Sequence, residues 1–428
     1  MIRILPAMVN ILLFLAASSY ANAQNLHDVV QKTLETNPDV LAAEKRKSIE
    51  EYNYDQIRGR YMPSLDITGA AGREWSDNPI TRGISADGVT LTRTELGVTL
   101  TQLLFDGFET KSALAGQESA IGTTTYQLQD VREVVGLRAI EVYIDVLRRM
   151  ELLDLAKENL AKHEETLQKI KLRSESGAGR RVDQVQTEGR LALAKATVLA
   201  AEQNLDDARS SYQSVVGELP YDLIRPDPFS PLPGTLEQTL EQARNANPAI
   251  LAAREEINTA RAGREQARSS YYPRVQLEAG ATRNNDLDGI EGINEDARMM
   301  VRMRYNLFNG GSDEARIASA GERVSEAMEK LAGIQRKVEE EVRLSWSALM
   351  NIRLRLKYLK AHRDHTEDVR GSYEKQFAIG QRSLLDLLDV ETELFRAKSD
   401  YVSAEYVELF ATYRILSSIG SLTKSLEL

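Results

Sequence analysis

The spacing of hydrophobic residues switches between two periods along the chain. Apolar side chains occupy every second position in two stretches of the first half, as in Leu96, Val98 and Leu100, and two stretches of the second half repeat this alternation. A period of two predicts β-strands, which we expect at residues 63–75, 91–105, 273–284 and 297–308. The remaining stretches have apolar residues three and four positions apart, which predicts helices at residues 26–60, 108–175, 182–217, 236–270, 311–378 and 384–420.

The elements of the second half repeat those of the first half. Asn37-Pro38 recurs 210 positions later as Asn247-Pro248, and from Phe105, which recurs as Phe308, the offset becomes 203. A repeat of about 200 residues is far longer than a solenoid unit, so it indicates a duplicated unit of domain size. The chain therefore divides into repeat 1 (24–217), a Pro-rich linker (218–235), repeat 2 (236–422) and a C-terminal tail (423–428).

Helix lengths indicate how each repeat folds. The proline-free helix that starts near Phe108 would be about 100 Å long at 1.5 Å per residue. Asn37 can cap a helix that has Pro38 in its first turn, and the heptad from Leu191 to Val215 predicts coiled-coil packing. The two shorter helices of a repeat, placed end to end, match the long helix. We therefore expect one full-length helix flanked by two half-length helices, with the hairpin at one end and a tight helical turn at the other.

The four strands have the length of tilted membrane-spanning strands, about 10–12 residues. Taken alone, they fit a soluble hairpin with one buried face equally well. Four strands cannot close a membrane barrel, which needs about eight, and open sheet edges do not face lipid. Three copies would pool their elements into a 12-stranded β-barrel and a 12-helix α-barrel tunnel, a mainly α fold with a membrane β portion.

Composition narrows the function classes. Residues 1–23 have the pattern of a secretory signal peptide, with Arg3 before an apolar stretch and Ala21-Asn22-Ala23 as the cleavage site. The chain has no cysteine, which excludes disulfides, thiolate catalysis and Cys-based metal sites. The net charge of −10 argues against nucleic-acid binding. His362 and His365 are three positions apart without a suitably spaced third ligand, so we expect solvated helix surface and no metal site.

Several motifs occur once in each repeat. The motif Asn-Pro-x-x-x-x-Ala begins at Asn37 and Asn247, and Tyr-x-Pro begins at Tyr61 and Tyr271. The strand-to-helix turn begins at Leu104 and Leu307, and the tip turn begins at Gly177 and Gly380. Together they resemble the TolC family of trimeric outer-membrane channel proteins over residues 26–422. The resemblance implies a homotrimer in the cell outer membrane, with lipid around its barrel and a large periplasmic tunnel. It implies no catalysis and no cofactor, because an inner-membrane ABC transporter or other pump, bridged by a periplasmic adaptor (membrane fusion protein), supplies the energy.

The branch of the family is indicated by two short segments. Residues 76–79 and the turn Gly179-Arg180-Arg181 look most like the branch that serves type I secretion, including agglutination-type adhesin exporters. We therefore expect a passive exit duct for secreted protein cargo in an ABC-driven type I system. The alternative is the outer-membrane duct of a tripartite drug-efflux pump, which has the same fold. A soluble periplasmic coiled-coil scaffold without a pore is the third possibility.

The tip of repeat 2 carries the main candidate site, a periplasmic gate. Asp386 and Asp389 are three positions apart on one helical face, so a trimer would stack two rings of three carboxylates, which select cations. In the family, the matching positions line the tip constriction, the position of Arg382 helps to hold it shut, and Asp183 matches a further tip position. In the alternative interpretation, Asp386 and Asp183 simply favour a helix N-terminus.

Two other groups of residues complete the candidate sites. The resemblance assigns adaptor contact to the tip turns, at Gly177, Gly179, Arg180, Gly380 and Gln381. The polar face of the last strand would point Arg298, Arg302 and Arg304 into the barrel lumen, either as general lumen polarity or as guidance for anions. Phe377 stands where some family members have Tyr, so we expect one hydrogen bond of the tip to be missing.

Overall fold

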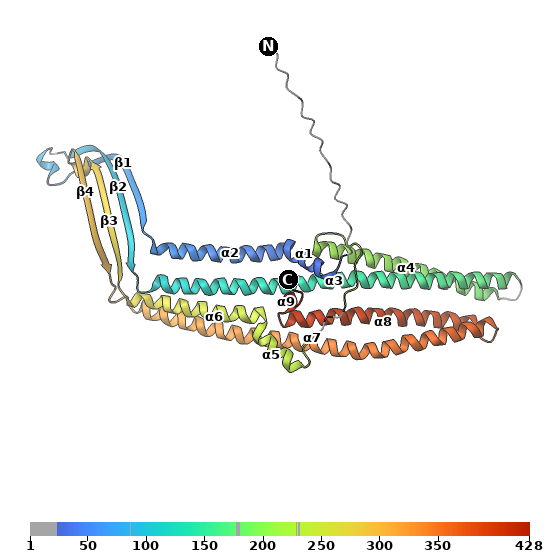
Figure 1. Cartoon of the computed structure of the whole chain (residues 1–428). Helices are drawn as coiled ribbons and strands as arrows, with labels where there is room; N and C mark the ends of the chain where they lie inside the picture. The colour runs from blue at the N-terminus through green and yellow to red at the C-terminus, as the bar shows by residue number, and fades with distance from the viewer. Residues whose placement is uncertain (1–23, 86, 177–179, 228, 230–231) are drawn as a thin grey trace, which may run out of the picture.

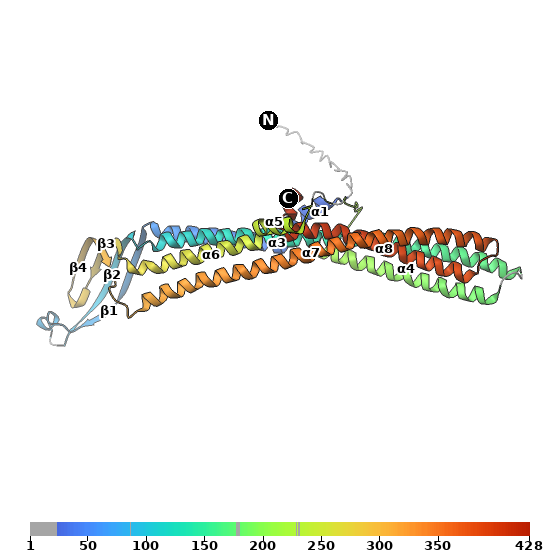
Figure 2. The ribbon, with the colours of Figure 1, turned by 90° about the horizontal axis from the view of Figure 1, so that it is seen from below.

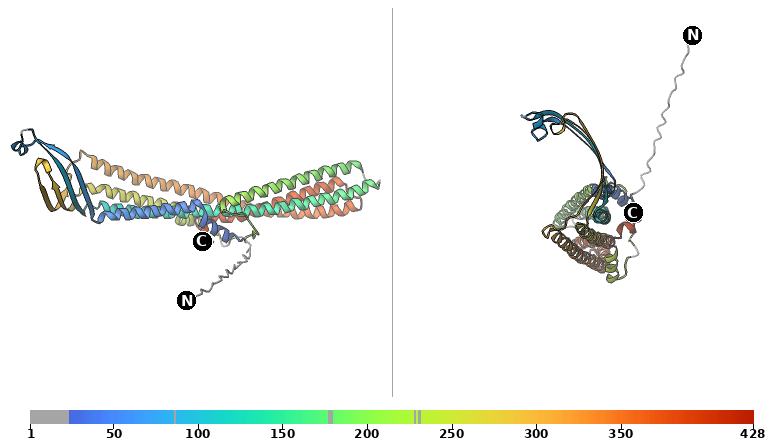
Figure 3. Two further views of the ribbon diagram at one scale, coloured as in Figure 1. Left: turned by 90° about the horizontal axis from the view of Figure 1, so that it is seen from above. Right: turned by 90° about the vertical axis from the view of Figure 1, so that its left-hand side faces the viewer.

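The molecule is a long helical body with a four-stranded sheet at one end (Figure 1). The structure is a computed structural model that describes residues 24–85, 87–176, 180–227, 229 and 232–428. The predicted signal peptide at 1–23 and the tip residues Gly177 and Gly179 lie outside the described residues. Seen from the sheet end, the sheet arches away from the helices to one side (Figure 3).

The sheet is antiparallel and has its strands in chain order, β1 (Ser64–Ser76), β2 (Val89–Phe105), β3 (Arg274–Asn285) and β4 (Ile293–Arg304). Leu65 pairs with Leu100, Leu100 with Ala279, and Ala279 with Met299, so apolar residues from all four strands share one face. Polar residues alternate with them on the opposite face. Strands β1 and β4 form the two edges, and each has one side without a partner strand among the described residues.

Strand pairing reproduces the two sequence offsets. Ser64 pairs with Thr101 in the first hairpin, and Arg274 pairs with Arg304 in the second. Arg274 lies 210 positions after Ser64, and Arg304 lies 203 positions after Thr101. The two hairpins therefore have the same register, and the seven-residue difference falls in the loop between β1 and β2.

The prediction for the last strand was wrong at both ends. We expected residues 297–308, whereas β4 spans Ile293–Arg304 and excludes Tyr305, Leu307 and Phe308. In repeat 1 the equivalent strand continues to Phe105, because β3 pairs with it as far as Val275. Beyond Arg304, no strand of the described residues continues the pairing, and the Asn306 side chain accepts a hydrogen bond from the Phe308 amide in a turn (3.2 Å).

Two long helices run the length of the body, α3 (Glu109–Glu175) and α7 (Ser312–Ala378), and each has 67 residues. Shorter helices lie alongside the long ones (Figures 1 and 2). In each repeat, one of them lies toward the sheet (α2 or α6) and another toward the tip (α4 or α8). The flanking helices are α1 (Leu26–Thr36), α2 (Pro38–Arg58) and α4 (Arg181–Val216) in repeat 1, and α5 (Leu236–Ala246), α6 (Pro248–Ala267) and α8 (Leu384–Ser418) in repeat 2.

The predicted helices 26–60 and 236–270 are each two helices. Asn37 ends α1 and caps α2, because its side chain accepts a hydrogen bond from the Asp39 amide (2.9 Å) and Pro38 takes the first helical position. Asn247 does the same for α6. The predicted tail at 423–428 begins within a further short helix, α9 (Leu422–Ser425).

The largest hydrophobic core lies at the waist of the body, where α1, α3, α4, α8 and α9 meet. Tyr143 of α3 is fully buried there, and burial raises the pKa of its hydroxyl to about 12. This hydroxyl lies 2.8 Å from the carbonyl oxygen of Gln24 and accepts a hydrogen bond from the Ile224 amide (3.0 Å). The start of repeat 1 and the Pro-rich linker are thereby held against the long helix.

The predicted coiled-coil seam of α4 is packed within the chain. Val198, Leu205 and Tyr212 are buried against α3, and Leu191 is half-buried. None of the described helices contains an 18-residue stretch apolar enough to cross a membrane.

Candidate functional site: the helical tip and the polar face of the sheet

The tip of repeat 2 is a tight turn between α7 and α8. Gly380 has a φ of 78°, which favours glycine, and the Gln381 amide donates to the Gln376 carbonyl oxygen (2.9 Å). Ser383 then begins α8 with a capping box. Its hydroxyl accepts from the Asp386 amide (3.2 Å), and the Asp386 carboxylate accepts from the Ser383 amide (3.3 Å).

Asp386 has the helix-end role that the alternative interpretation predicted, and it also contacts Arg382. Arg382 Nη1 lies 3.7 Å from the Asp386 carboxylate. The hydrogen bonds with Ser383, and then the charge of Arg382, hold the pKa of this carboxyl below its ordinary value. Arg382 itself lies over the Tyr373 ring, 4.2 Å from the centroid, and donates to Gln376 (2.9 Å). The guanidinium is therefore fixed from three directions.

Asp389 has a different partner, which was not predicted from the sequence. Arg190 Nη2 of α4 lies 2.7 Å from Asp389 Oδ1. The contact joins the two repeats near the tip, across 199 positions of sequence. Asp386 and Asp389 share one helix, yet the structure gives each carboxylate its own arginine.

The tip of repeat 1 has fewer contacts. Arg180 precedes α4 at the capping position, and Asp183 lies in the first turn of the helix. The Asp183 carboxylate forms no ion pair or side-chain hydrogen bond within the described residues. Arg173 lies over the ring of Phe377, 4.7 Å from its centroid, so this ring joins the two tips without the hydroxyl that a tyrosine would add.

The three arginines of β4 lie on the polar face of the sheet, as predicted. Arg302 Nε lies 2.9 Å from Glu278 Oε1 on β3. Arg298 pairs with Gly280, and Arg304 lies directly opposite Arg274. The structure thus pairs one of the three with a carboxylate and places another opposite a like charge.

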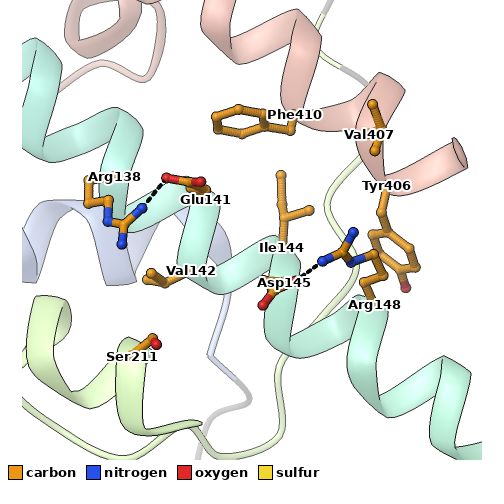
Figure 4. A pocket seen from close by; sticks show the side chains of 10 residues that line it. All are labelled: Arg138, Glu141, Val142, Ile144, Asp145, Arg148, Ser211, Tyr406, Val407 and Phe410. Carbon is orange, nitrogen blue, oxygen red and sulfur yellow. Dashed lines mark hydrogen bonds and ion pairs between the residues drawn. The ribbon is translucent and has the colours of Figure 1, made fainter. Parts of the chain in front are cut away.

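A crevice at the waist lies between α3, α4 and α8 (Figure 4). Its volume is about 300 Å³. The charged groups of α3 pair with one another there, Arg138 with Glu141 at 2.5 Å and Arg148 with Asp145. Ile144 points toward Phe410 across the gap. Because its charges are already paired along one helix, the crevice has the character of a packing gap.

One buried carboxylate was missed by sequence analysis. Glu133 of α3 accepts hydrogen bonds from the Leu422 amide (2.9 Å), the Thr423 amide (3.0 Å) and the Thr423 hydroxyl (2.6 Å). Burial raises the pKa of this carboxyl. The only signal in the sequence was one acidic residue among the apolar positions of a long helix. In the described part of the chain, no group of three or more His, Asp or Glu side chains is arranged to hold a metal ion.

Comparison with known proteins identifies the family. The family model described as outer membrane efflux protein matches residues 29–218 and again residues 239–421, once per repeat. The chain is 26% identical to the outer membrane efflux protein BepC of Brucella suis, over 94% of this chain and 87% of BepC. It is 25% identical to the alkaline protease secretion protein AprF of Pseudomonas aeruginosa, over 95% of this chain and 86% of AprF.

The fold is also that of known channels. The crystal structure of the Campylobacter jejuni CmeC outer membrane channel superposes with a TM-score of 0.80, at 16% identity, over 94% of this chain and 86% of CmeC. The predicted fold class of long helices with a small antiparallel sheet is therefore confirmed. The chain belongs to the outer membrane efflux protein family and is an outer-membrane channel protein, as its resemblance to the TolC family predicts.

Proposed function

We propose that three copies of this chain form a duct that exports polypeptides through the outer membrane in a type I secretion system. One observation carries the trimeric duct, namely a sheet with one exposed apolar face and two edges that have no partner strand among the described residues. Ile67 and Met299 on that face are each 72% exposed. Such a face is stable against lipid, and such edges are stable only when paired.

Closure by three copies satisfies both requirements. β1 of one copy would pair with β4 of the next, and the twelve strands would form a barrel with the apolar face toward lipid. The polar face, with Arg302 and Glu278, would then line the lumen. The long helices would continue this lumen across the periplasm as a tunnel.

The tip is the proposed gate and adaptor contact. Three copies would bring Asp386 and Asp389 together as rings of carboxylates, which favour cations in a narrow passage. Arg382 and Arg190 would limit the mutual repulsion of these carboxylates. Arg180, Gly380 and Gln381 are exposed at the end of the body, where a periplasmic adaptor bound to an ABC transporter would dock.

Secretion is supported by the segments at 76–79 and 179–181 and by the similarity to AprF, a secretion protein. Drug efflux is the second candidate, because BepC, an efflux protein, has nearly the same identity over nearly the same length. The two candidates share the duct and differ in the inner-membrane pump.

Deletion of the gene would separate the candidates. We expect the deletion strain to lose at least one protein from the culture supernatant and to keep its resistance to toxic compounds. The wild-type chain supplied in trans should restore the secreted protein. A strain with unchanged secretion and increased sensitivity to dyes and antibiotics would assign the duct to an efflux pump.

A further inference from the structure

A hollow lies at the base of the sheet, between residues of β3, β4, α6 and α7. Figure 1 shows these four elements meeting there. Its volume is about 630 Å³, within the ~300–1,000 Å³ range of small-molecule sites. The wall includes Gly263 of α6 and Ser270 of the 3-10 turn that follows it, residues 268–271, whose small size leaves the space open. Four guanidinium groups line it, those of Arg274, Arg304, Arg316 and Arg323.

The hollow opens on the polar face of the sheet. Arg274 and Arg304 line it, whereas their strand neighbours Val275 and Met303, which point to the apolar face, do not. Adjacent residues of a strand point to opposite faces. A ligand would therefore enter from the aqueous side, and a lipid headgroup on the apolar side of the sheet could not reach it.

The carboxylates of the hollow are already engaged. Asp106 accepts from the Thr110 amide and hydroxyl (2.8 and 2.5 Å). Glu109 lies 3.5 Å from Arg274, and Asp313 lies 2.6 Å from Arg316. Within the part of the chain that the structure describes, two lining arginines form no ion pair, Arg304 and Arg323.

The cross-strand geometry is unfavourable for Arg304, which has no counter-charge among the described residues, whereas its partner Arg274 is paired with Glu109. Arg274 and Arg304 are direct partners in the antiparallel pair of β3 and β4. Like charges in this position destabilise a sheet. The first turn of α7, at Ser312, adds the positive end of a long helix nearby.

Repeat 1 shows that the fold does not need these charges. The two hairpins have the same register, and α3 and α7 have the same length, so equivalent positions are known from the offsets of 210 and 203. Repeat 1 has an uncharged residue at each of the four positions: Ser64, Thr101, Ala113 and Ala120. The arginines are thus a feature of repeat 2 alone, on a framework that forms equally well without them.

We propose that this hollow is a binding site for oxyanions, that is, carboxylate or phosphate groups that arrive from the lumen. Guanidinium groups bind both by paired hydrogen bonds. Such a site would retain anionic segments of a cargo, or small anions, at the junction of barrel and tunnel. The lumenal route rests on the proposed function, whereas anion binding itself does not.

A neighbouring copy offers one competing counter-charge. In the proposed barrel, β4 of one copy pairs with β1 of the next. If this pair has the register of β2 and β3, in which Thr101 lies opposite Glu278, then Arg304 lies opposite Thr68 of the next copy. Asp66 is two residues away from Thr68 on the same face. If that carboxylate neutralised Arg304, the site would be filled by protein.

Isothermal titration calorimetry of the purified full-length protein in detergent, at low salt, tests the proposal with inorganic pyrophosphate and with citrate. We expect saturable binding of at least one of them. Arg304→Thr with Arg323→Ala, which installs the residues of repeat 1, should weaken binding at least tenfold. Arg304→Lys with Arg323→Lys keeps the charge and should retain most of it. Arg336→Ala, an exposed arginine of α7 outside the hollow, should leave the affinity unchanged.

Two results would overturn the proposal. One is equal affinity of the wild type and the Thr/Ala variant, provided that both have the same melting temperature. The other is no binding to the wild type together with binding to Asp66→Asn, which would assign Arg304 to a neighbouring carboxylate. Since binding is measured without transport, neither result depends on whether the duct serves secretion or efflux.

Discussion

Two carboxylates at the tip, those of Asp386 and Asp389, are expected to make the proposed gate selective for cations. Asp386→Asn with Asp389→Asn removes six charges from the proposed trimeric gate, so cation selectivity should fall and block by divalent cations from the periplasmic side should disappear. Single-channel recordings in planar bilayers measure both. The control is Asp207→Asn, at an exposed position of α4 away from the tip that has no ion pair among the described residues. Unchanged selectivity in the double variant would leave these aspartates as helix-end and inter-repeat contacts.

A buried histidine near the same tip predicts a pH effect on stability. Burial, and then the charge of Arg190, lowers the pKa of His163 on α3 below its ordinary value. The unfolded chain therefore takes up a proton at a higher pH than the folded chain, and stability is lost as the pH falls below about 6.5 toward the folded pKa.

His163→Gln should remove this part of the pH dependence. The melting temperature of the wild type should fall more between pH 7.5 and pH 5.5 than that of the variant. His365→Gln, at an exposed position of α7, is the control and should behave as the wild type does. Equal slopes for the wild type and His163→Gln would mean that folding does not lower the pKa of His163.

In the proposed barrel, one face of each strand contacts lipid and the other faces water. Two neighbouring methionines of β4 can test which face is which. Met299 lies on the apolar face and Met300 on the polar face of β4. An arginine on the lipid side of a membrane strand costs about 2–4 kcal/mol near the midplane. Met299→Arg should therefore reduce the amount of heat-resistant trimer in outer-membrane fractions, whereas Met300→Arg should not. The reverse order would mean that the apolar face is turned inward.

The helices and strands show which features can be predicted from the sequence. Strand alternation and the helix cap at Asn37 depend on neighbouring residues, so the sequence predicted them. The end of β4 was misplaced because no strand of the described residues pairs with the chain beyond Arg304. The contacts of Arg190 with Asp389 and of Glu133 with the start of α9 were missed for a similar reason, since they join residues 199 and 289 positions apart.

At the scale of the whole molecule, the duplication predicts how copies meet. Inside the chain, β2 of repeat 1 pairs with β3 of repeat 2, with Thr99 opposite Gly280. If the repeats are equivalent around the proposed barrel, β4 must pair with β1 of the next copy in the same way. The repeat-2 equivalent of Thr99 is Arg302, 203 positions later, and the repeat-1 equivalent of Gly280 is Ala70, 210 positions earlier. These two residues should therefore be direct partners across the seam between copies, on the polar face.

A cysteine pair can test this register, because the chain has no cysteine of its own. Direct partners in an antiparallel pair have Cα atoms about 4.5–5.5 Å apart, within the range of a disulfide. Arg302→Cys with Ala70→Cys should give covalent dimers and trimers on non-reducing gels after mild oxidation, and reductant should return them to monomers. Arg302→Cys with Thr68→Cys moves one cysteine two residues along the same face, about 7–8 Å from its target, so it should link poorly. Efficient linkage of the Thr68 pair and none of the Ala70 pair would show that the copies meet in another register than the one repeated inside the chain.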